Sequence, residues 1–139
     1  MKALISATAI AAALLAGCST QQPQTNADMA KAGAGAPSTP TVATDGTLIG
    51  PDGRTLYVYS RDARGSGKSA CVDQCAANWP PLGVASTAQS IGEYTVITRA
   101  DGNKQWAYKG MPLYYFAKDT KPGDKTGQGM GGVWSIAKP

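Results

Sequence analysis

The sequence predicts a small all-β domain made of two pseudo-symmetric β-meander repeats, packed as a sandwich or partly open barrel, with one short helix between them. One observation is an internal duplication, because residues 53–62 recur as residues 110–119 with Gly, Leu, Tyr, an aromatic, a basic residue and Asp at matching places. The other is a series of turn signals at short spacing between β-prone segments. Since duplicated segments fold as duplicated units, the repeat defines the predicted architecture.

The first copy covers about residues 41–81. It opens with a short β-prone stretch and an Asp-Gly turn, and residues 51–53, Pro-Asp-Gly, then join two strands, since Pro fixes φ and Gly accepts the left-handed conformation. Tyr57 and Tyr59 share one face of the second strand, because side chains alternate along a strand. Leu and Val occupy its other face, so we expect a central strand, which Asp62 ends.

The second copy covers about residues 92–137 and repeats this plan at greater length. Its predicted strands are residues 94–98, 104–108 and 112–117, with a closing strand at 132–137. Turns are expected at residues 100–103, which carry Asp-Gly, and at the Lys-Gly pair that follows the second strand.

One helix is predicted between the copies, over residues 69–79, with Ser69 as its N-cap and a Pro-Pro pair beyond its end. The second copy has a glycine-rich segment at residues 126–132 instead. That segment lacks the Gly-Lys-Ser/Thr spacing of a phosphate-binding loop, so we interpret it as an adaptable connection.

The N-terminus predicts export and lipid attachment. Residues 1–17 have the form of a lipoprotein signal peptide, with an apolar run of the secretory size that is too short to remain as a membrane-spanning helix. The run closes on Leu-Ala-Gly-Cys, which predicts cleavage before Cys18 and attachment of diacylglycerol and a further acyl chain such as palmitate. Two or three chains anchor a protein firmly where one does not. Ser19 after the Cys favours an outer-membrane anchor facing the periplasm.

Residues 18–40 are rich in Gln, Thr, Ala, Gly, Ser and Pro and contain hardly any large apolar side chain. Such a segment cannot bury enough surface to offset its chain entropy, so we expect a lipidated flexible tether. The folded part is then residues 41–139, one small domain.

Composition argues against several functions. The mature chain would carry twelve basic and nine acidic side chains, scattered along the sequence, which does not favour nucleic-acid binding. There is no histidine, so histidine-based nucleophile systems, histidine-ligated zinc and Cys-x-x-Cys-His haem attachment are excluded. No acidic pair has helix spacing. We therefore expect no enzyme activity, no cofactor and no metal site.

Cys71 and Cys75 remain as a pair once Cys18 is lipidated, in a compartment that permits disulfides. At i and i+4 on a helical turn, their side chains would share a face and could form a bridge. We expect a structural disulfide. The alternative is a copper or thiol-exchange site, since Cys-x-x-x-Cys also resembles the thiol motif of copper chaperones for cytochrome oxidase assembly.

The duplicated aromatic and acidic residues allow two interpretations. They can form the core of the domain, with their polar atoms bonded locally, and this is the interpretation we favour. They can instead form a ligand platform where the two copies meet. Its candidate binding residues are Tyr57, Tyr59, Asp62, Tyr114, Phe116 and Asp119.

The two copies resemble the bacterial secreted-repeat lipoproteins, a family described by a Tyr-x-(Phe/Trp/Tyr)-x-x-Asp motif and without an established biochemical role. Tyr57, Tyr59 and Asp62 meet the motif once, and the second copy meets it at the matching positions. The resemblance covers roughly everything after Thr41. It implies this fold and an envelope location, and it carries no catalytic residues.

These observations together predict a membrane-anchored envelope lipoprotein that acts as a non-enzymatic binding or structural interaction module. Its expected partners are the membrane, through the lipid on Cys18, and envelope proteins or cell-wall polymers. The alternative function is a periplasmic redox or copper-handling accessory protein that uses Cys71 and Cys75.

Overall fold

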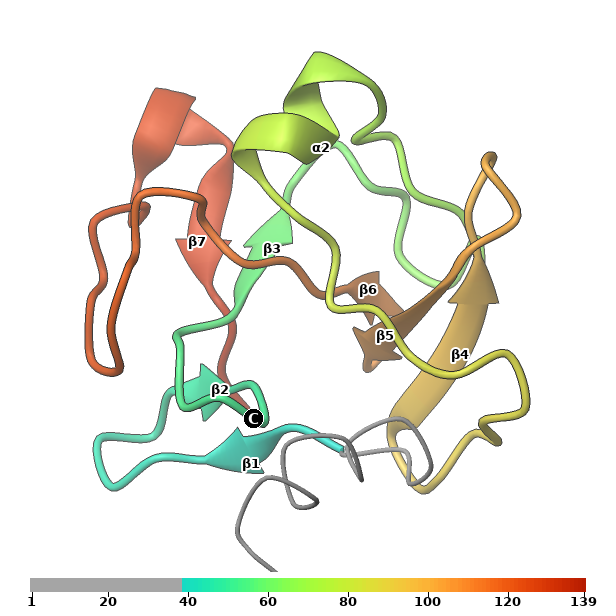
Figure 1. Cartoon of the computed structure of the whole chain (residues 1–139), viewed down its shortest axis with the longest axis horizontal. Helices are drawn as coiled ribbons and strands as arrows, with labels where there is room; N and C mark the ends of the chain where they lie inside the picture. The colour runs from blue at the N-terminus through green and yellow to red at the C-terminus, as the bar shows by residue number, and fades with distance from the viewer. Residues whose placement is uncertain (1–38) are drawn as a thin grey trace, which may run out of the picture.

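The computed structural model describes residues 39–139, so the predicted signal peptide, Cys18 and nearly all of the predicted tether lie outside the described residues. Within them, the strands are β1 Thr41–Val42, β2 Leu48–Ile49, β3 Tyr57–Tyr59, β4 Tyr94–Thr98, β5 Lys104–Tyr108, β6 Met111–Pro112 and β7 Trp134–Ile136, and the helices are α2 Gln74–Asn78 and the 3-10 turn η2 Met130–Gly132. The predicted fold class is confirmed: small sheets dominate, with one short α-helix and no closed barrel in this part of the chain (Figure 1).

None of the helices within residues 39–139 has the length and apolar character needed to cross a membrane.

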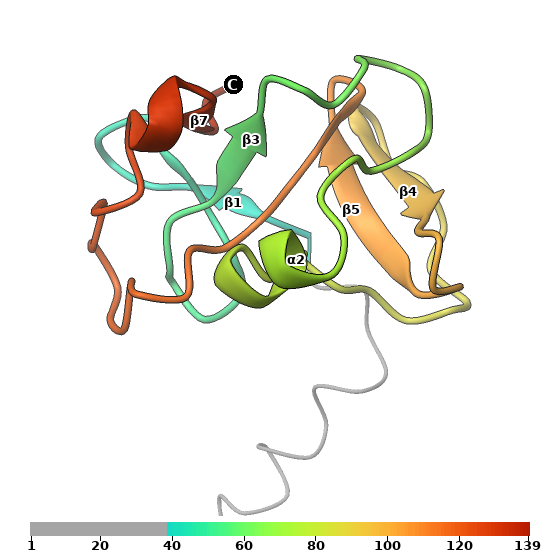
Figure 2. The ribbon, with the colours of Figure 1, turned by 90° about the horizontal axis from the view of Figure 1, so that it is seen from above.

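The strands form three small antiparallel sheets, β1-β2, β3-β7 and β4-β5-β6. In Figure 2 the β4-β5 hairpin lies at one side of the domain and β3 with β7 at the other, while α2 lies between them. The sheet of the second copy is the predicted meander. Its first two strands have the predicted bounds, because alternating side chains over five residues and Asp-Gly turns specify a hairpin locally.

A tight turn joins β5 to β6. Lys109 and Gly110 both have positive φ, 47° and 80°, which is the conformation that twists a two-residue hairpin to match its strands.

The first copy departs from the predicted three-stranded meander, because β3 pairs with β7 of the second copy. Its link to β2 is one bridge between Ile49 and Thr55 and a bond from Leu56 N–H to the Leu48 carbonyl, 2.9 Å. The end of each copy thus contributes to the other copy's sheet. Ala137 N–H donates to the Leu56 carbonyl at 2.8 Å, and Leu82 N–H, at the end of the first copy, donates to the Leu113 carbonyl at 2.9 Å.

This exchange is pseudo-twofold symmetric. The closing segments complete matching three-residue groups, Leu48–Leu56–Ala137 and Trp106–Leu113–Leu82, whose backbone bonds run in the same order. The symmetry axis passes between Tyr57 and Tyr114, which bond to each other reciprocally through N–H and carbonyl at 2.8 and 2.9 Å. The predicted pseudo-symmetry therefore includes an exchange of closing strands between the copies.

The predicted helix over residues 69–79 is wrong in extent. The helix begins at Gln74, and Ser69 is not its cap, because the Ser69 hydroxyl bonds to the Tyr114 hydroxyl and accepts from Arg99. The N-cap position is Asp73, with a φ of 50° and no side-chain capping bond. Cys71 consequently lies before the helix and not on its first turn.

Two strand predictions are also too long. The strand expected at residues 112–117 is a strand only at Met111–Pro112, after which Tyr114 bridges both Tyr57 and Pro81. An extended segment that is bonded alternately to two neighbours gives no continuous ladder. The closing strand expected at residues 132–137 is shortened by the 3-10 turn η2, in which glycines adopt positive φ.

The core is divided between the two faces of β3. Leu56 and Val58 belong to a leucine-rich hydrophobic cluster with Leu48, Trp106 and Leu113. Tyr57 and Tyr59 belong to an aromatic cluster with Cys71, Trp79, Tyr114, Phe116 and Trp134. The predicted alternation along this strand is confirmed, and the aromatic cluster occupies the junction between the two copies.

Candidate functional site

The motif tyrosine of each copy bonds to the motif aspartate of the other copy. The Tyr57 hydroxyl donates to Asp119 Oδ2 at 2.5 Å, and the Tyr114 hydroxyl donates to Asp62 Oδ2 at 2.6 Å. All four side chains are at most 4% exposed. We call these pairs the Tyr57–Asp119 lock and the Tyr114–Asp62 lock, because each one joins the two copies through a buried, charge-assisted hydrogen bond.

The second carboxylate oxygen of each lock holds the loop that follows its motif. Asp119 Oδ1 accepts from the Thr126 N–H at 3.0 Å and from the Thr126 hydroxyl. Asp62 Oδ1 accepts from the Ala70 N–H at 2.6 Å. Burial raises the pKa of Asp62, although the bonds from Tyr114 and Ala70 and the charge of Arg99 oppose this shift. Each motif aspartate therefore connects a strand of the other copy to its own loop.

Four aromatic rings stack across the junction between the copies. Trp79 and Trp134 are parallel with centroids 3.8 Å apart, and Phe116 and Tyr59 lie on their outer faces, each 4.3 Å from its neighbour. Trp79 and Trp134 occupy matching places in the two copies, so the stack follows the pseudo-twofold symmetry. Only Tyr59 among these four rings is half-buried; the others are buried.

Cys71 and Cys75 form a disulfide, as predicted, with their Cα atoms 5.2 Å apart. Cys71 is fully buried in the aromatic cluster, whereas Cys75 is half-buried. The bridge closes the turn that leads into α2 and holds the Cys71 backbone beside the Tyr114–Asp62 lock. Across residues 39–139, no three or more His, Cys, Asp or Glu side chains are grouped so as to hold a metal ion.

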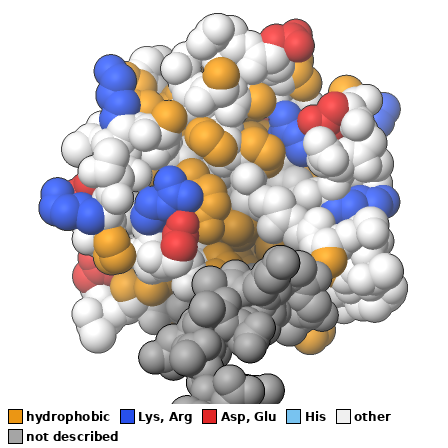
Figure 3. All heavy atoms as spheres, viewed as in Figure 1, with side chains coloured by type: hydrophobic (Ala, Val, Ile, Leu, Met, Phe, Trp, Pro, Cys, Tyr) orange, Lys and Arg blue, Asp and Glu red, His pale blue; other side chains and the backbone are white. Residues whose placement is uncertain are grey.

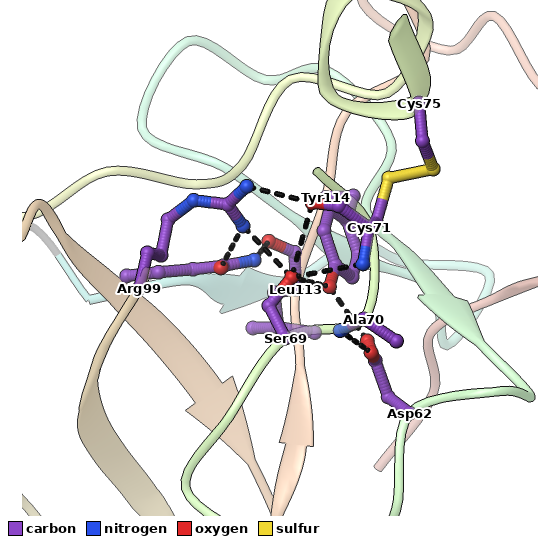
Figure 4. Close-up of a disulfide and its surroundings, with 9 residues drawn as sticks. Asp62, Ser69, Ala70, Cys71, Cys75, Arg99, Leu113 and Tyr114 are labelled. Carbon is purple, nitrogen blue, oxygen red and sulfur yellow. Dashed lines mark hydrogen bonds between the residues drawn. A yellow bond between two sulfur atoms is a disulfide. The ribbon is translucent and has the colours of Figure 1, made fainter. Parts of the chain in front are cut away.

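A buried arginine extends the Tyr114–Asp62 lock into a polar network (Figure 4). Arg99 Nη1 donates to the Ser69 hydroxyl at 2.9 Å and to Gln105 Oε1 at 2.7 Å, and Nη2 donates to the Cys71 carbonyl at 2.7 Å. Ser69 and Tyr114 share a 2.7 Å bond. Tyr114 gives its one proton to Asp62, so Ser69 donates in that 2.7 Å bond in preference to its longer, 3.2 Å contact with the Cys71 carbonyl. The protons then run from Ser69 through Tyr114 to Asp62.

Sequence reasoning did not identify Arg99, Gln105 or the role of Ser69. One signal was available: Arg99 follows β4 and is two residues from the buried Ile97, so the period of two places both side chains on the inner face. An inward-facing arginine requires buried partners. The sequence does not reveal which partners, because Ser69 and Cys71 come from the other copy.

The six predicted ligand-binding residues are brought together by the structure. Five of them, all except Tyr59, are buried, with the hydroxyls of Tyr57 and Tyr114 bonded to the two aspartates. In this arrangement they form the core and the locks, which is the interpretation that the sequence favoured. On the face shown in Figure 3, acidic and basic side chains are scattered and do not gather in one patch.

Two copies of one β unit, joined by reciprocal buried locks and by exchanged closing strands, define a duplicated β module. The chain belongs to the family of secreted repeats of unknown function, whose sequence model matches it twice, over residues 40–83 and 95–138. The resemblance inferred from the motif and the presence of two copies are thereby confirmed, and the family indicates an extracellular or envelope location. Comparisons with curated proteins and with solved structures gave no match.

The locks predict how the domain responds to alkaline pH. Burial raises the pKa values of Tyr57 and Tyr114 above the usual 10.0, and their bonds to Asp119 and Asp62 raise them further. The pKa of Tyr115 is also raised, first by burial and then by the charge of Asp52. A tyrosine whose folded-state pKa is raised stabilises the fold fully below its unfolded pKa, and that contribution is lost as the pH rises. We expect stability to decline above about pH 10.

Phenolate absorbance, followed together with circular dichroism, tests this expectation. Tyr57, Tyr114 and Tyr115 should ionise only as the domain unfolds. In denaturant, all six tyrosines of the chain should ionise in one step. Ionisation of all six while the folded circular dichroism signal persists would show that the locked hydroxyls are accessible, contrary to the structure.

Removing the disulfide should lower stability without abolishing the fold. The five-residue loop predicts a loss of about 2 kcal/mol for the double variant Cys71→Ser/Cys75→Ser, on the chain-entropy model. Thermal unfolding should shift down by about 4–8 °C per kcal/mol. Mass spectrometry of the wild-type chain should show a gain of about 2 Da on reduction, for two added hydrogens. Two free thiols in protein isolated from the cell envelope would contradict a structural bridge.

Proposed function

We propose that this chain is a membrane-anchored envelope lipoprotein whose duplicated β domain acts as a non-enzymatic binding or structural interaction module. The signal-peptide pattern ending at Cys18 and the secreted-repeat family support export and anchoring. A flexible tether over residues 18–40, as the sequence predicts, would hold the domain a few nanometres from the lipid surface. We propose the periplasmic side of the outer membrane as its location.

The observation that carries a non-enzymatic role is the use of the motif residues. Both motif aspartates are buried and accept hydrogen bonds on both carboxylate oxygens, and both motif tyrosines donate to them. A general acid or base must reach the proton that it transfers to or from a substrate. Groups that are bonded to each other inside a core support the packing of two copies and not a reaction.

The partners we propose are envelope proteins or cell-wall polymers. A folded domain on the predicted tether would contact them within the reach of its anchor. The mature chain's excess of basic residues supports weak attraction to anionic polymers, in addition to any specific contact.

Metabolic labelling with palmitate tests the anchor. The wild-type chain should incorporate the label and fractionate with the outer membrane, and Cys18→Ser should do neither. Cys75→Ser is the matched control, since it replaces a disulfide cysteine outside the predicted lipidation sequence and should leave labelling unchanged. Label on the Cys18→Ser chain, or wild-type protein free in the soluble periplasm, would exclude this anchor.

Sedimentation with isolated cell-wall polymers and membrane fractions tests the module. We expect saturable binding of the folded Cys18→Ser chain to one of these fractions, and no release of soluble fragments from the polymer. A heat-unfolded sample provides the control for non-specific adsorption. Turnover of a wall polymer by the wild-type chain would contradict the non-enzymatic role. If the chain binds none of the fractions saturably, the binding role is contradicted.

A further inference from the structure

Arg99 has no counterpart in the first copy. The turns at residues 43–47 and 99–103 are closed by the same pair of backbone bonds. In the first turn the Ala43 N–H donates to the Thr47 carbonyl at 2.8 Å, and in the second the Arg99 N–H donates to the Asn103 carbonyl at 2.9 Å. In each turn a Gly N–H also donates to the carbonyl of the first residue. Ala43 therefore occupies the place of Arg99. Only one half of the molecule carries a buried guanidinium at this position.

The duplication provides an internal control for the role of that cation. The Tyr57–Asp119 lock forms with bonds from Tyr57 and Thr126 alone, so a lock does not require a guanidinium. Moving an ionised group out of water costs free energy that its partners only partly repay. A cation that the sister lock does without, yet that has a side chain only 3% exposed, calls for a role other than holding the lock.

The Arg99 guanidinium has hydrogen-bonding capacity left over. It has five N–H donors, and its bonds to Ser69, Gln105 and Cys71 use three of them. Nε is buried without a hydrogen-bond partner. The nearest carboxylate oxygen, Asp101 Oδ2, lies 3.9 Å from Nε, too far for a hydrogen bond.

A surface hollow of about 360 Å³ opens on this arginine, lined by Lys68, Ser69, Thr98, Arg99 and Ala100. Lys68 is exposed at its rim, and the lining residue Thr98 is bonded through Oγ1 to Lys104 Nζ at 2.6 Å. Two cations, Lys68 and Arg99, thus line a space that also offers the Thr98 hydroxyl, whose oxygen accepts from Lys104 and whose proton is free to donate. A second hollow, on the side of Arg99 that faces Asp73 and Asp101, has acidic side chains and does not suit an anion.

We propose that the hollow between Lys68, Ser69 and Arg99 binds an oxyanion, a carboxylate or phosphate group carried by a ligand of the envelope. Charge-assisted bonds from ammonium and guanidinium groups to oxyanions are the strong class of hydrogen bond. The disulfide contributes by fixing the Cys71 carbonyl that orients Nη2. This inference rests on the proposed function as a binding module and names the chemical group that the module recognises.

Nuclear magnetic resonance of the ¹⁵N-labelled Cys18→Ser chain tests the site directly. Inorganic phosphate and acetate are titrated separately, at constant ionic strength set with sodium chloride. We expect saturable shifts of the Ser69, Thr98 and Ala100 amides and of Arg99 Nε–H with at least one of them, and the anion that acts at the lower concentration identifies the preferred group. Shifts that are absent for both anions, or that are spread evenly over exposed lysines, would overturn the proposal.

Variants separate this site from general charge. Arg99→Gln should weaken binding about tenfold or more, the loss of a charge-assisted hydrogen bond, and Lys68→Gln should weaken it several-fold. Lys125→Gln removes an equal charge beside Asp45, away from the hollow, and should leave binding unchanged. Lys68 is exposed, so its variant tests the site even where Arg99→Gln fails to fold. Equal weakening by Lys68→Gln and Lys125→Gln would also overturn the proposal.

Failure of this site can be distinguished from failure of the proposed function. If the wild type shows no response to either anion while the wild type and Lys68→Gln both bind envelope fractions saturably, the oxyanion site is excluded. The binding module then remains. Loss of envelope binding by every folded variant and by the wild type removes the module itself.

Discussion

Asp119→Ala is expected to lower the free energy of unfolding by about 1–3 kcal/mol, because the buried Tyr57 hydroxyl loses its partner. Asp119 also accepts from the N–H and hydroxyl of Thr126, but Thr126 is exposed, so water can replace those two bonds. A loss of this size is a large fraction of the stability of a small domain. Chemical denaturation followed by circular dichroism measures it.

Asp52→Ala is the matched control for that experiment. Asp52 is also an aspartate that bonds to a turn, but its side chain is 44% exposed and its partner is the neighbouring Arg54. An exposed pair of this kind contributes less than about 1 kcal/mol. Equal effects of the two substitutions would mean that burial and the bond between copies add nothing at Asp119.

Trp79→Ala is expected to be the most destabilising single change, by about 3–5 kcal/mol, the range for removal of a buried large aromatic side chain. Trp79 is 5% exposed and lies in the stack between Trp134 and Phe116, with Tyr57 edge-on at 5.3 Å. Packing is so close here that a Cβ added at Gly127 would lie 2.7 Å from Trp79 Cη2. Alanine would therefore open a cavity that spans both copies.

Two further variants check the cause of that loss. Trp79→Phe keeps an aromatic ring in the stack and should recover part of the stability, whereas Ile91→Ala, at an exposed apolar position, should change it little. A Trp79→Ala domain as stable as the wild type would show that the stack does not hold the two copies together.

The local parts of the fold were predictable from the sequence. β4 and β5 have the predicted bounds because five-residue alternation and an Asp-Gly turn act between near neighbours. The disulfide was predictable because its two cysteines are four residues apart. The two faces of β3 also follow from the period of two, which places Tyr57 and Tyr59 together.

The pairing between copies was not predictable in the same way. β3 has a choice between neighbours in its own copy and β7, and the sequence pattern contains no information on which of them it meets. The predicted helix from Ser69 was wrong because the serine hydroxyl is used by Tyr114 and Arg99, contacts that are 45 and 30 residues away along the chain. Long-range partners decided both outcomes over local propensity.

The candidate site shows the same division. The motif residues were identified from the duplication, because identical packing needs identical side chains. Their bonding across the copies, Tyr57 to Asp119 and Tyr114 to Asp62, follows only from the exchange of closing strands. Arg99 was not identified because it occurs in one copy, where comparison of the repeats gives no signal.

A double-mutant cycle tests most directly whether the motif joins the two copies. Tyr57→Phe and Asp119→Ala, measured singly and together, should show a coupling of about 0.5–3 kcal/mol, as for residues in contact. Tyr57→Phe with Asp62→Ala, the aspartate of the same copy, should be additive within about 0.5 kcal/mol. Coupling of Tyr57 to Asp62 and additivity with Asp119 would contradict the account, since each motif would then be closed within its own copy.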